Sequence, residues 1–332
     1  MRSPKPKVEI AAMGRFLPER VLTNAELEKM VDTTDEWITE RTGIRERRIA
    51  DADTGAAVMG TAAACTAMQR AGVQPGEVDL IVVATATPDR LLPSTACDIQ
   101  AMLGATNAAA FDVSAACTGF IYALDVAEAH LAAGRGEIAL VISAEKMSAI
   151  TDWSDRTTCV LFGDGAGAAV LRRTQNGQDR GILSSFIRSD GTLAELLWRP
   201  AGGARIPMDY AVIDERSHLV RMAGREVFKA AVRSMAEAAD MALQRAGLTG
   251  DDIDLLVPHQ ANMRIIEATA KYAGIPMEKV FVNIHKYGNM SSATVPIALD
   301  EAVEEGRLEP GDHVLMVAFG AGFTWGSSVV RW

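Results

Sequence analysis

One stretch of this chain recurs 175 positions later, and this repeat limits the possible folds more than any other feature. Gln69-Arg70-Ala71-Gly72 and Gln244-Arg245-Ala246-Gly247 are identical, and each closes an apolar helical segment. Each then leads through Asp-Leu into a short apolar strand. The segments that start at Gly136 and Gly311 match at the same spacing. Several matches at one spacing indicate an internal duplication.

The alternation of helices with apolar strands predicts the fold class. Strands expected over 78–85 and 138–143 are almost continuously apolar, as is typical of parallel sheets covered by helices. We therefore expect an α/β protein of two duplicated, mostly parallel-sheet halves, 1–175 and 176–332, packed as a pseudo-dimer. Ligands should bind beyond the carboxyl ends of the strands of both halves. Residues 190–225 have no counterpart in the first half and predict an inserted surface loop.

Cys117 lies at a predicted strand-to-helix junction. It belongs to Phe111-Asp112-Val113-Ser114-Ala115-Ala116-Cys117-Thr118-Gly119-Phe120, after which a helical pattern continues over 120–133. The positive end of a helix dipole and its unpaired N–H groups favour a thiolate, so the sequence predicts a reactive thiol. For a cysteine considered alone, the alternative is a buried structural residue.

The second half supplies two polar partners for this cysteine. His259 directly follows an apolar strand, and Asn289 lies near the position that corresponds to Cys117 in the duplicate. Packing the halves about a pseudo-twofold axis would bring the three side chains together in one site. There Cys, His and Asn can perform nucleophilic acyl chemistry. Considered singly, His259 could be a core histidine and Asn289 a helix cap.

Composition argues against several other classes of protein. The four cysteines form no CxxC pair and have no histidine at ligand spacing, which argues against a zinc site and a disulfide framework. No uncharged apolar run reaches about 18 residues and the N-terminus has no signal-peptide core, so we expect a cytoplasmic protein without membrane spans. The net charge of −10 argues against general nucleic-acid binding.

Further motifs are similar to those of one protein family. They are Thr34-Asp35-Glu36-Trp37-Ile38, Arg41-Thr42-Gly43-Ile44-Arg45-Glu46-Arg47, Phe162-Gly163-Asp164-Gly165-Ala166-Gly167, His259-Gln260-Ala261-Asn262 and Thr324-Trp325-Gly326-Ser327. With the cysteine segment they cover nearly the whole chain, which resembles the β-ketoacyl-acyl-carrier-protein synthase III family of the thiolase superfamily. The resemblance implies the five-layered αβαβα thiolase-like fold, a homodimer, and an acyltransferase that initiates type II fatty-acid synthesis.

The resemblance also implies a role for each catalytic residue. An acyl group, typically acetyl, would pass from coenzyme A to Cys117 as a thioester, and malonyl-acyl carrier protein would then lose carbon dioxide and attack it. Neutral His259 and the Asn289 amide would donate hydrogen bonds to the enolate oxygen. The backbone N–H groups of Cys117 and Ala321 would form the oxyanion hole. The family usually has glycine where this chain has Ala321, so this alanine must tolerate the φ that the turn requires.

Substrate contacts follow from the same resemblance. Coenzyme A would be a substrate rather than a tightly bound cofactor, and no metal is implied. Its contacts would be Trp37 and Arg156 at the adenine, Arg41 at the phosphates and Asn262 along the pantetheine. The residues that dock the acidic carrier protein would be Lys229, Arg264 and Lys271, which without the resemblance are ordinary solvated charges. Leu92 would gate the acyl pocket of the partner subunit.

Three alternative functions are compatible with some of these residues. A condensing enzyme of a secondary pathway would keep the same three catalytic residues and take longer or unusual primers. A papain-like cysteine protease also uses Cys, His and Asn, but the duplication and the absence of Trp beside Cys117 argue against it. A non-catalytic acyl-binding protein of the same fold is disfavoured because all three side chains are retained.

Overall fold

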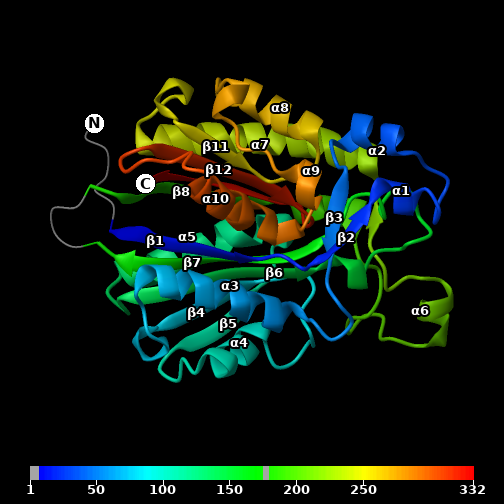
Figure 1. Ribbon diagram of the computed structural model, residues 1–332, viewed down its shortest axis with the longest axis horizontal. Helices are drawn as coiled ribbons and strands as arrows, with labels where there is room; N and C mark the ends of the chain where they lie inside the picture. The colour runs from blue at the N-terminus through cyan, green and yellow to red at the C-terminus, as the bar shows by residue number, and fades with distance from the viewer. Residues whose placement is uncertain (1–6, 175–178) are drawn as a thin grey trace.

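Two β-sheets form the framework of the molecule, for which a computed structural model describes residues 7–174 and 179–332 (Figure 1). The first sheet has the strand order β1-β7-β6-β4-β5, made by Val8–Phe16, Asp164–Arg173, Ile138–Lys146, Leu80–Ala84 and Ala109–Val113. The second has the order β11-β12-β13-β8, made by Leu255–Pro258, His313–Gly320, Thr324–Arg331 and Gly181–Ser189. The predicted boundary between residues 175 and 176 lies outside the described residues.

Both sheets have the same plan, as the repeated sequence predicted. β4 and β6 correspond to β11 and β12 at the spacing of 175, and β7 and β1 correspond to β13 and β8 in the order across the sheet. A single parallel bridge between Leu256 and Val280 takes the place of the pairing between β4 and β5. The second half therefore repeats the first with a reduced edge strand.

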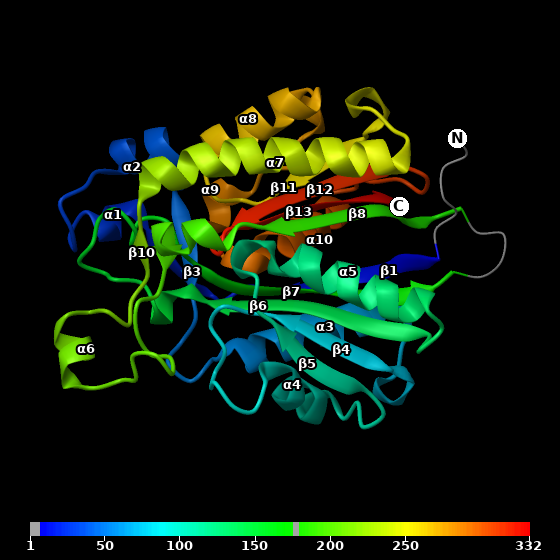
Figure 2. The same cartoon turned by 180° about the vertical axis from the view of Figure 1, so that it is seen from behind.

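Helices and sheets alternate in five layers, which confirms the predicted thiolase-like αβαβα fold (Figures 1 and 2). The two central helices, α5 (Gly119–Ala132) and α10 (Thr294–Glu304), lie between the sheets. The outer face of the first sheet is covered by α3 (Ala56–Ala71) and α4 (Thr95–Leu103). The outer face of the second is covered by α7 (Gly224–Ala246) and α8 (Met263–Ala273). All five residues of β4 are buried, because helices cover both of its faces.

Each sheet combines parallel and antiparallel strands. β4 runs parallel to β5 and β6, and β11 runs parallel to β12. β1, β7, β13 and β8 join their neighbours antiparallel. The connection from β6 to β7 contains only a short 3₁₀ turn, and without a crossover helix consecutive strands pair antiparallel.

The central helices begin at matching 3₁₀ turns, and these two turns are in contact. They are η2 (Ala116–Thr118) and η7 (Ser291–Ala293), again 175 positions apart. Each opens on a non-glycine residue with positive φ, 45° at Ala116 and 47° at Ser291. Such backbone strain is common at functional sites, and here both halves conserve it in the same place.

Smaller elements gather at the end of the molecule where these turns lie (Figure 1). They are β2 (Arg20–Thr23), β3 (Glu46–Ile49), α1 (Asn24–Leu27), α2 (Asp35–Thr42), α9 (Ile284–Tyr287), β9 (Leu197–Trp198), α6 (Tyr210–Asp214) and β10 (Arg221–Met222). The remaining 3₁₀ turns are Pro75–Glu77, Met147–Ala149, Gly191–Leu196, Gly250–Asp252 and Met277–Lys279. Among the described residues, no helix has the length and apolar character needed to cross a membrane.

Candidate active site

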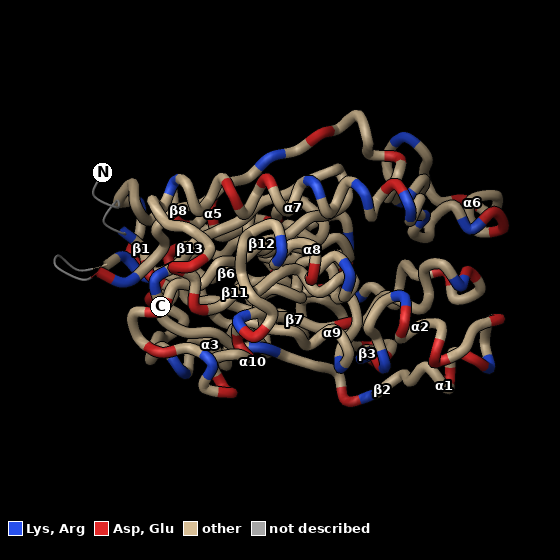
Figure 3. The backbone as a smooth tube through the Cα atoms, turned by 90° about the horizontal axis from the view of Figure 1, so that it is seen from above, with Lys and Arg blue, Asp and Glu red and all other residues tan. Residues whose placement is uncertain are grey.

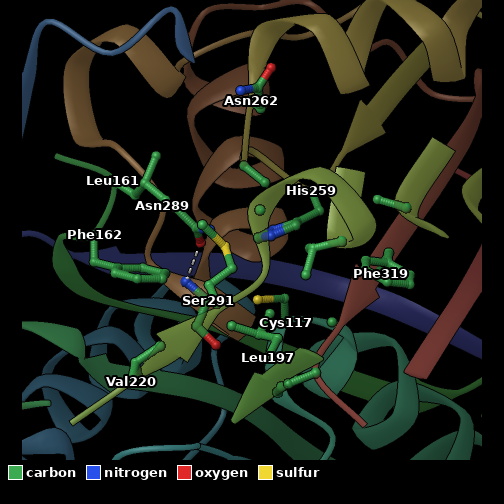
Figure 4. A pocket seen from close by; sticks show the side chains of 18 of the residues that line it. Cys117, Leu161, Phe162, Leu197, Val220, His259, Asn262, Asn289, Ser291 and Phe319 are labelled. Carbon is green, nitrogen blue, oxygen red and sulfur yellow. Dashed lines mark hydrogen bonds between the residues drawn. The ribbon is translucent and has the colours of Figure 1, made fainter. Parts of the chain in front are cut away.

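A pocket of about 600 Å³ opens at this end, between the two halves. Cys117, His259 and Asn289 all line it, and their side chains point toward one another (Figure 4). Cys117 lies in η2, just before α5, His259 directly follows β11, and Asn289 lies in the segment before η7. The structure thus brings together the three residues that the sequence predicted, at the carboxyl ends of parallel strands.

Cys117 is deeply buried. Its exposed fraction is 8%, and burial raises the pKa of its thiol to about 12. A hydrogen bond with Ser291 opposes this rise in pKa, while the nearby Glu145 carboxyl adds to it. The loss of hydration therefore opposes the thiolate that the helix end favours.

The backbone around Cys117 leaves room for a substrate oxygen. A Cβ on Gly320 would lie 2.6 Å from the Cys117 nitrogen, so any side chain at position 320 would occupy the space beside this N–H group. Gly320, Ala321 and Gly322 all line the pocket. The positive φ of this turn falls on Gly322, at 134°, and not on Ala321. The turn therefore accepts an alanine where the family usually has glycine.

His259 is a neutral histidine fixed at the end of β11. Its backbone N–H donates to the Val317 carbonyl at 2.8 Å, and its ring Nδ1 lies 2.6 Å from the hydroxyl of Thr294. Burial lowers the pKa of the ring to about 3, and it has no carboxylate partner in the described part of the chain. A neutral imidazole can donate a hydrogen bond without carrying a charge.

Asn289 is held so that its amide faces the pocket. Its backbone N–H donates to the Leu161 carbonyl at 2.9 Å, and its carbonyl accepts the Gly163 N–H at 3.0 Å. Its Oδ1 accepts the Ser291 N–H at 2.8 Å, drawn as the dashed line in Figure 4. This bond leaves the NH₂ group to face the pocket. Asn289 follows α9 and is not itself at the strand-to-helix junction, because Ser292 is the duplicate of Cys117.

The duplicate of the Cys117 position is closed by a side chain. Glu145, which corresponds to Gly320, is fully buried and accepts hydrogen bonds from the Ser292 hydroxyl at 2.6 Å and backbone N–H at 3.3 Å. The Thr87 hydroxyl at 2.8 Å, the Ala86 N–H at 3.0 Å and the Thr85 hydroxyl at 3.5 Å also donate to it. One carboxyl group therefore fills the space in the first half that stays open in the second.

The predicted coenzyme A residues lie at the mouth of the pocket. The guanidinium groups of Arg41 and Arg156 lie 5.0 and 5.1 Å from the centre of the Trp37 ring. Arg156 also donates to the Asp32 carbonyl at 2.7 Å. Trp37 and Arg41 line the pocket. At this distance no further ring fits between the Arg156 guanidinium and the Trp37 ring, since each stacked contact needs about 3.5 Å.

Asn262 and Arg264 join the mouth to α8. Asn262 is the N-cap of α8, and its side chain accepts the Arg264 N–H and donates to the Arg41 carbonyl at 2.8 Å. Both residues line the pocket. Asn262 thus shapes the wall by holding α8 against α2, in addition to presenting its own surface.

The remaining predicted residues are exposed and lie outside the lining of the pocket. Lys229 lies on α7 and Lys271 in the last turn of α8, and both are exposed. Basic residues occur along both of these helices (Figure 3). Leu92 has an exposed fraction of 86%, beside the similarly exposed Leu91. A leucine so exposed has no packing role within its own subunit.

Sequence reasoning missed the apolar end of the pocket. It is lined by Met147, Ile150, Phe162, Leu197 and Val220. The last two belong to 190–225, so the prediction of a plain surface loop is wrong: part of this segment folds back as β9 and β10 and walls the pocket. The signal was its apolar residues, which a solvated loop does not need.

The chain is similar to known proteins over nearly its whole length. Residues 111–191 match the family model of 3-oxoacyl-[acyl-carrier-protein (ACP)] synthase III, and 243–332 match its C-terminal model. The beta-ketoacyl-[acyl-carrier-protein] synthase III of Caldanaerobacter subterraneus subsp. tengcongensis is 53% identical over 97% of both chains. The crystal structure of the Aquifex aeolicus VF5 enzyme of that name superposes with a TM-score of 0.90, at 50% identity, covering 98% of this chain and 100% of that one.

A second solved structure with the same fold comes from another pathway. The priming β-ketosynthase of the R1128 polyketide pathway has a TM-score of 0.91 at 38% identity, covering 99% of this chain and 98% of that one. Fold and site together define an acyl-transferring enzyme of the thiolase type. The extent of the identity is more specific: the chain belongs to the β-ketoacyl-[acyl-carrier-protein] synthase III family.

Proposed function

We propose that the protein condenses an acyl-coenzyme A primer, with acetyl as the preferred acyl group, with malonyl-acyl carrier protein and so initiates type II fatty-acid synthesis. The observation that carries this proposal is the convergence of Cys117, neutral His259 and the Asn289 amide in one buried pocket. The reaction would take place in the cytoplasm, with coenzyme A thioesters as substrates and no tightly bound cofactor.

In the first half-reaction, Cys117 attacks the primer carbonyl. The new C–S bond forms to Cys117, the bond to coenzyme A breaks, and the proton of the Cys117 thiol ends on the coenzyme A sulfur. The tetrahedral oxyanion would be bound by the N–H groups of Cys117 and Ala321, in the space that Gly320 leaves open. Each such donor lowers the barrier by about 3–4 kcal/mol.

In the second half-reaction, malonyl-carrier protein loses carbon dioxide. The bond to the carboxylate breaks, and its electron pair moves onto an enolate whose oxygen accepts hydrogen bonds from His259 and Asn289. Neutral donors suit this step, because an imidazolium would bind the malonyl carboxylate and oppose its loss. The carbanion then attacks the thioester, and the released Cys117 sulfur recovers a proton from water because of its raised pKa.

Substrate recognition would use both ends of the site. Trp37, Arg41 and Arg156 supply a flat surface and positive charge for the nucleotide of coenzyme A, with Asn262 along the pantetheine. The basic positions Lys229, Arg264 and Lys271 would attract an acidic carrier protein to a protein that itself has a net charge of −10.

A homodimer is the assembly that the first sheet favours. β5 is an edge strand, and Phe111 on this strand is exposed, as are Met102 on α4 and the Leu91–Leu92 pair nearby in sequence. An unpaired edge flanked by apolar side chains is a typical pairing surface. In such a dimer Leu92 would reach the acyl pocket of the partner subunit.

Intact-protein mass spectrometry tests the function directly. The protein and its Cys117→Ala variant would be incubated with acetyl-, butyryl-, longer and branched acyl-coenzyme A. We expect an acyl mass only on the unaltered protein, largest with acetyl, and its loss upon addition of malonyl-carrier protein. No adduct from any thioester would contradict the proposal.

An enzyme of a secondary pathway is the second candidate. It is favoured by the similarity to the R1128 priming synthase and by the apolar end of the pocket around Met147, Phe162 and Val220. The same experiment separates the two, because acylation by a longer or branched primer in preference to acetyl would support the second candidate.

A further inference from the structure

The ring of His259 has one polar neighbour on its Nδ1 side within the described chain. That neighbour is the hydroxyl of Thr294, 2.6 Å away, in the first turn of α10. Both residues are buried, with exposed fractions of 3% and 0%. A contact of this length between buried polar atoms is a hydrogen bond, and water has no access to replace it.

The direction of this bond follows from what else the hydroxyl can bind. The other acceptor near it is the Ser291 carbonyl, at the longer distance of 3.2 Å. That carbonyl also accepts the backbone N–H of Thr294. The contact of 2.6 Å between the hydroxyl and the ring is short for an N–H donor but ordinary for an O–H donor. Among the described residues, the ring Nδ1 has no other hydrogen-bond partner. The Thr294 hydroxyl therefore donates its proton to Nδ1 of the imidazole.

We infer that Thr294 is a positioning residue that donates to Nδ1 of His259 and so places the single ring proton on Nε2. The hydroxyl thereby selects the tautomer whose N–H is available to the pocket. Because β-branching restricts the rotamers of threonine, the hydroxyl is held in place at little further entropic cost. The inference rests on the proposed function, in which this N–H stabilises the enolate.

The duplicate half supports a specific role for Thr294 over a general packing role. The positions that correspond to His259 and Thr294 are Ala84 and Gly119, which are again neighbours: a Cβ on Gly119 would lie 2.8 Å from the Cβ of Ala84. The first half thus builds the same junction without a hydroxyl or a ring. The pair in the second half is therefore not required by the fold of the junction itself.

Three variants and one spectroscopic readout test the inference. Thr294→Val removes the hydroxyl and keeps the shape, Thr294→Ser restores the hydroxyl, and Thr269→Val removes another buried threonine hydroxyl, which bonds the Ile265 carbonyl at 2.8 Å on α8. Tautomers would be read by ¹⁵N NMR of histidine-labelled protein, with His259→Gln used to assign the signal among the five histidines. Acylation of Cys117 and decarboxylation of malonyl-carrier protein would be measured separately.

We expect the unaltered protein, Thr294→Ser and Thr269→Val to carry the ring proton on Nε2. Thr294→Val should populate the Nδ1–H form and slow decarboxylation roughly 10- to 100-fold, below the loss caused by removing an oxyanion donor outright. The rate at which Cys117 is acylated in Thr294→Val should stay within about twofold of the rate in the unaltered protein, because that step does not use the enolate contact.

Three results would overturn the inference. The first is a ring proton on Nδ1 in the unaltered protein, and the second is normal decarboxylation by a folded Thr294→Val. The third is an equal loss in both half-reactions, which would indicate a general packing defect. The NMR measurement uses no substrate, so failure of the proposed function would show only in the acylation and decarboxylation assays. The two failures are therefore distinguishable.

Discussion

At the scale of single residues, the site depends on uncharged groups. Cys117 is protonated in the free protein because burial raises the pKa of its thiol, and His259 is neutral because burial lowers the pKa of its ring. Glu145 accepts hydrogen bonds from five donors at the duplicate junction and is not among the residues that line the open pocket. In the proposed mechanism the reactive charges therefore arise during the reaction.

The protonation of Cys117 predicts how its alkylation responds to pH. With a pKa near 12, the thiolate is a minor species throughout the neutral range, so its fraction rises about tenfold for each pH unit. We expect the rate of iodoacetamide labelling at Cys117, followed by peptide mass spectrometry, to rise in this way from about pH 7 to 10. The Cys117→Ala variant accounts for labelling elsewhere. A plateau reached below pH 8 would mean that the helix end does stabilise a thiolate at rest.

At the scale of elements, the mouth of the pocket is built by pieces that the chain brings together from both halves. Asn262 links α8 to α2, and Arg156 is held against Trp37 by its bond to Asp32. The mouth of the pocket is thus partly closed at this point. In the proposed binding of coenzyme A, the adenine would exchange the contact between Arg156 and Trp37 for two stacked contacts, one on each side of the base.

The basic side chains of α7 and α8 predict a selective effect on the carrier protein. We expect Arg264→Glu to raise the apparent KM for malonyl-carrier protein about threefold to tenfold, because a reversed charge repels an acidic partner. Acylation by acetyl-coenzyme A at saturating concentration should change little. Arg135→Glu, an equal change of charge at an exposed position between α5 and β6, is the matched control. Equal effects of the two variants would place the docking surface elsewhere.

At the scale of the whole molecule, the repeat in the sequence predicted the fold well and the site in part. The spacing of 175 placed Cys117, His259 and the segment of Asn289 at one junction, because equivalent strand ends must meet across a pseudo-twofold axis. It did not predict Thr294 or the wall formed by Leu197 and Val220. These depend on side-chain contacts between distant segments, for which periodicity and local motifs carry no signal.

The exposed edge of the first sheet predicts a dimer that one charge can break. We expect sedimentation of the unaltered protein as a dimer and a dissociation constant at least about tenfold higher for Phe111→Asp, because a charge would be buried in the interface. Tyr272→Asp, which changes an exposed aromatic on α8, should leave the dimer unchanged. A monomeric unaltered protein would contradict both the assembly and the role of Leu92.

The closed duplicate around Glu145 bears on how such a molecule can diverge. A symmetric ancestor with two open junctions would have had to keep two sets of reactive groups in register. The junction that Glu145 fills holds Ala84 and Gly119 where the open one holds His259 and Thr294, and it holds Ser292 where the open one holds Cys117. A duplicated chain can in this way keep one reaction centre open and let the matching position serve as structural support.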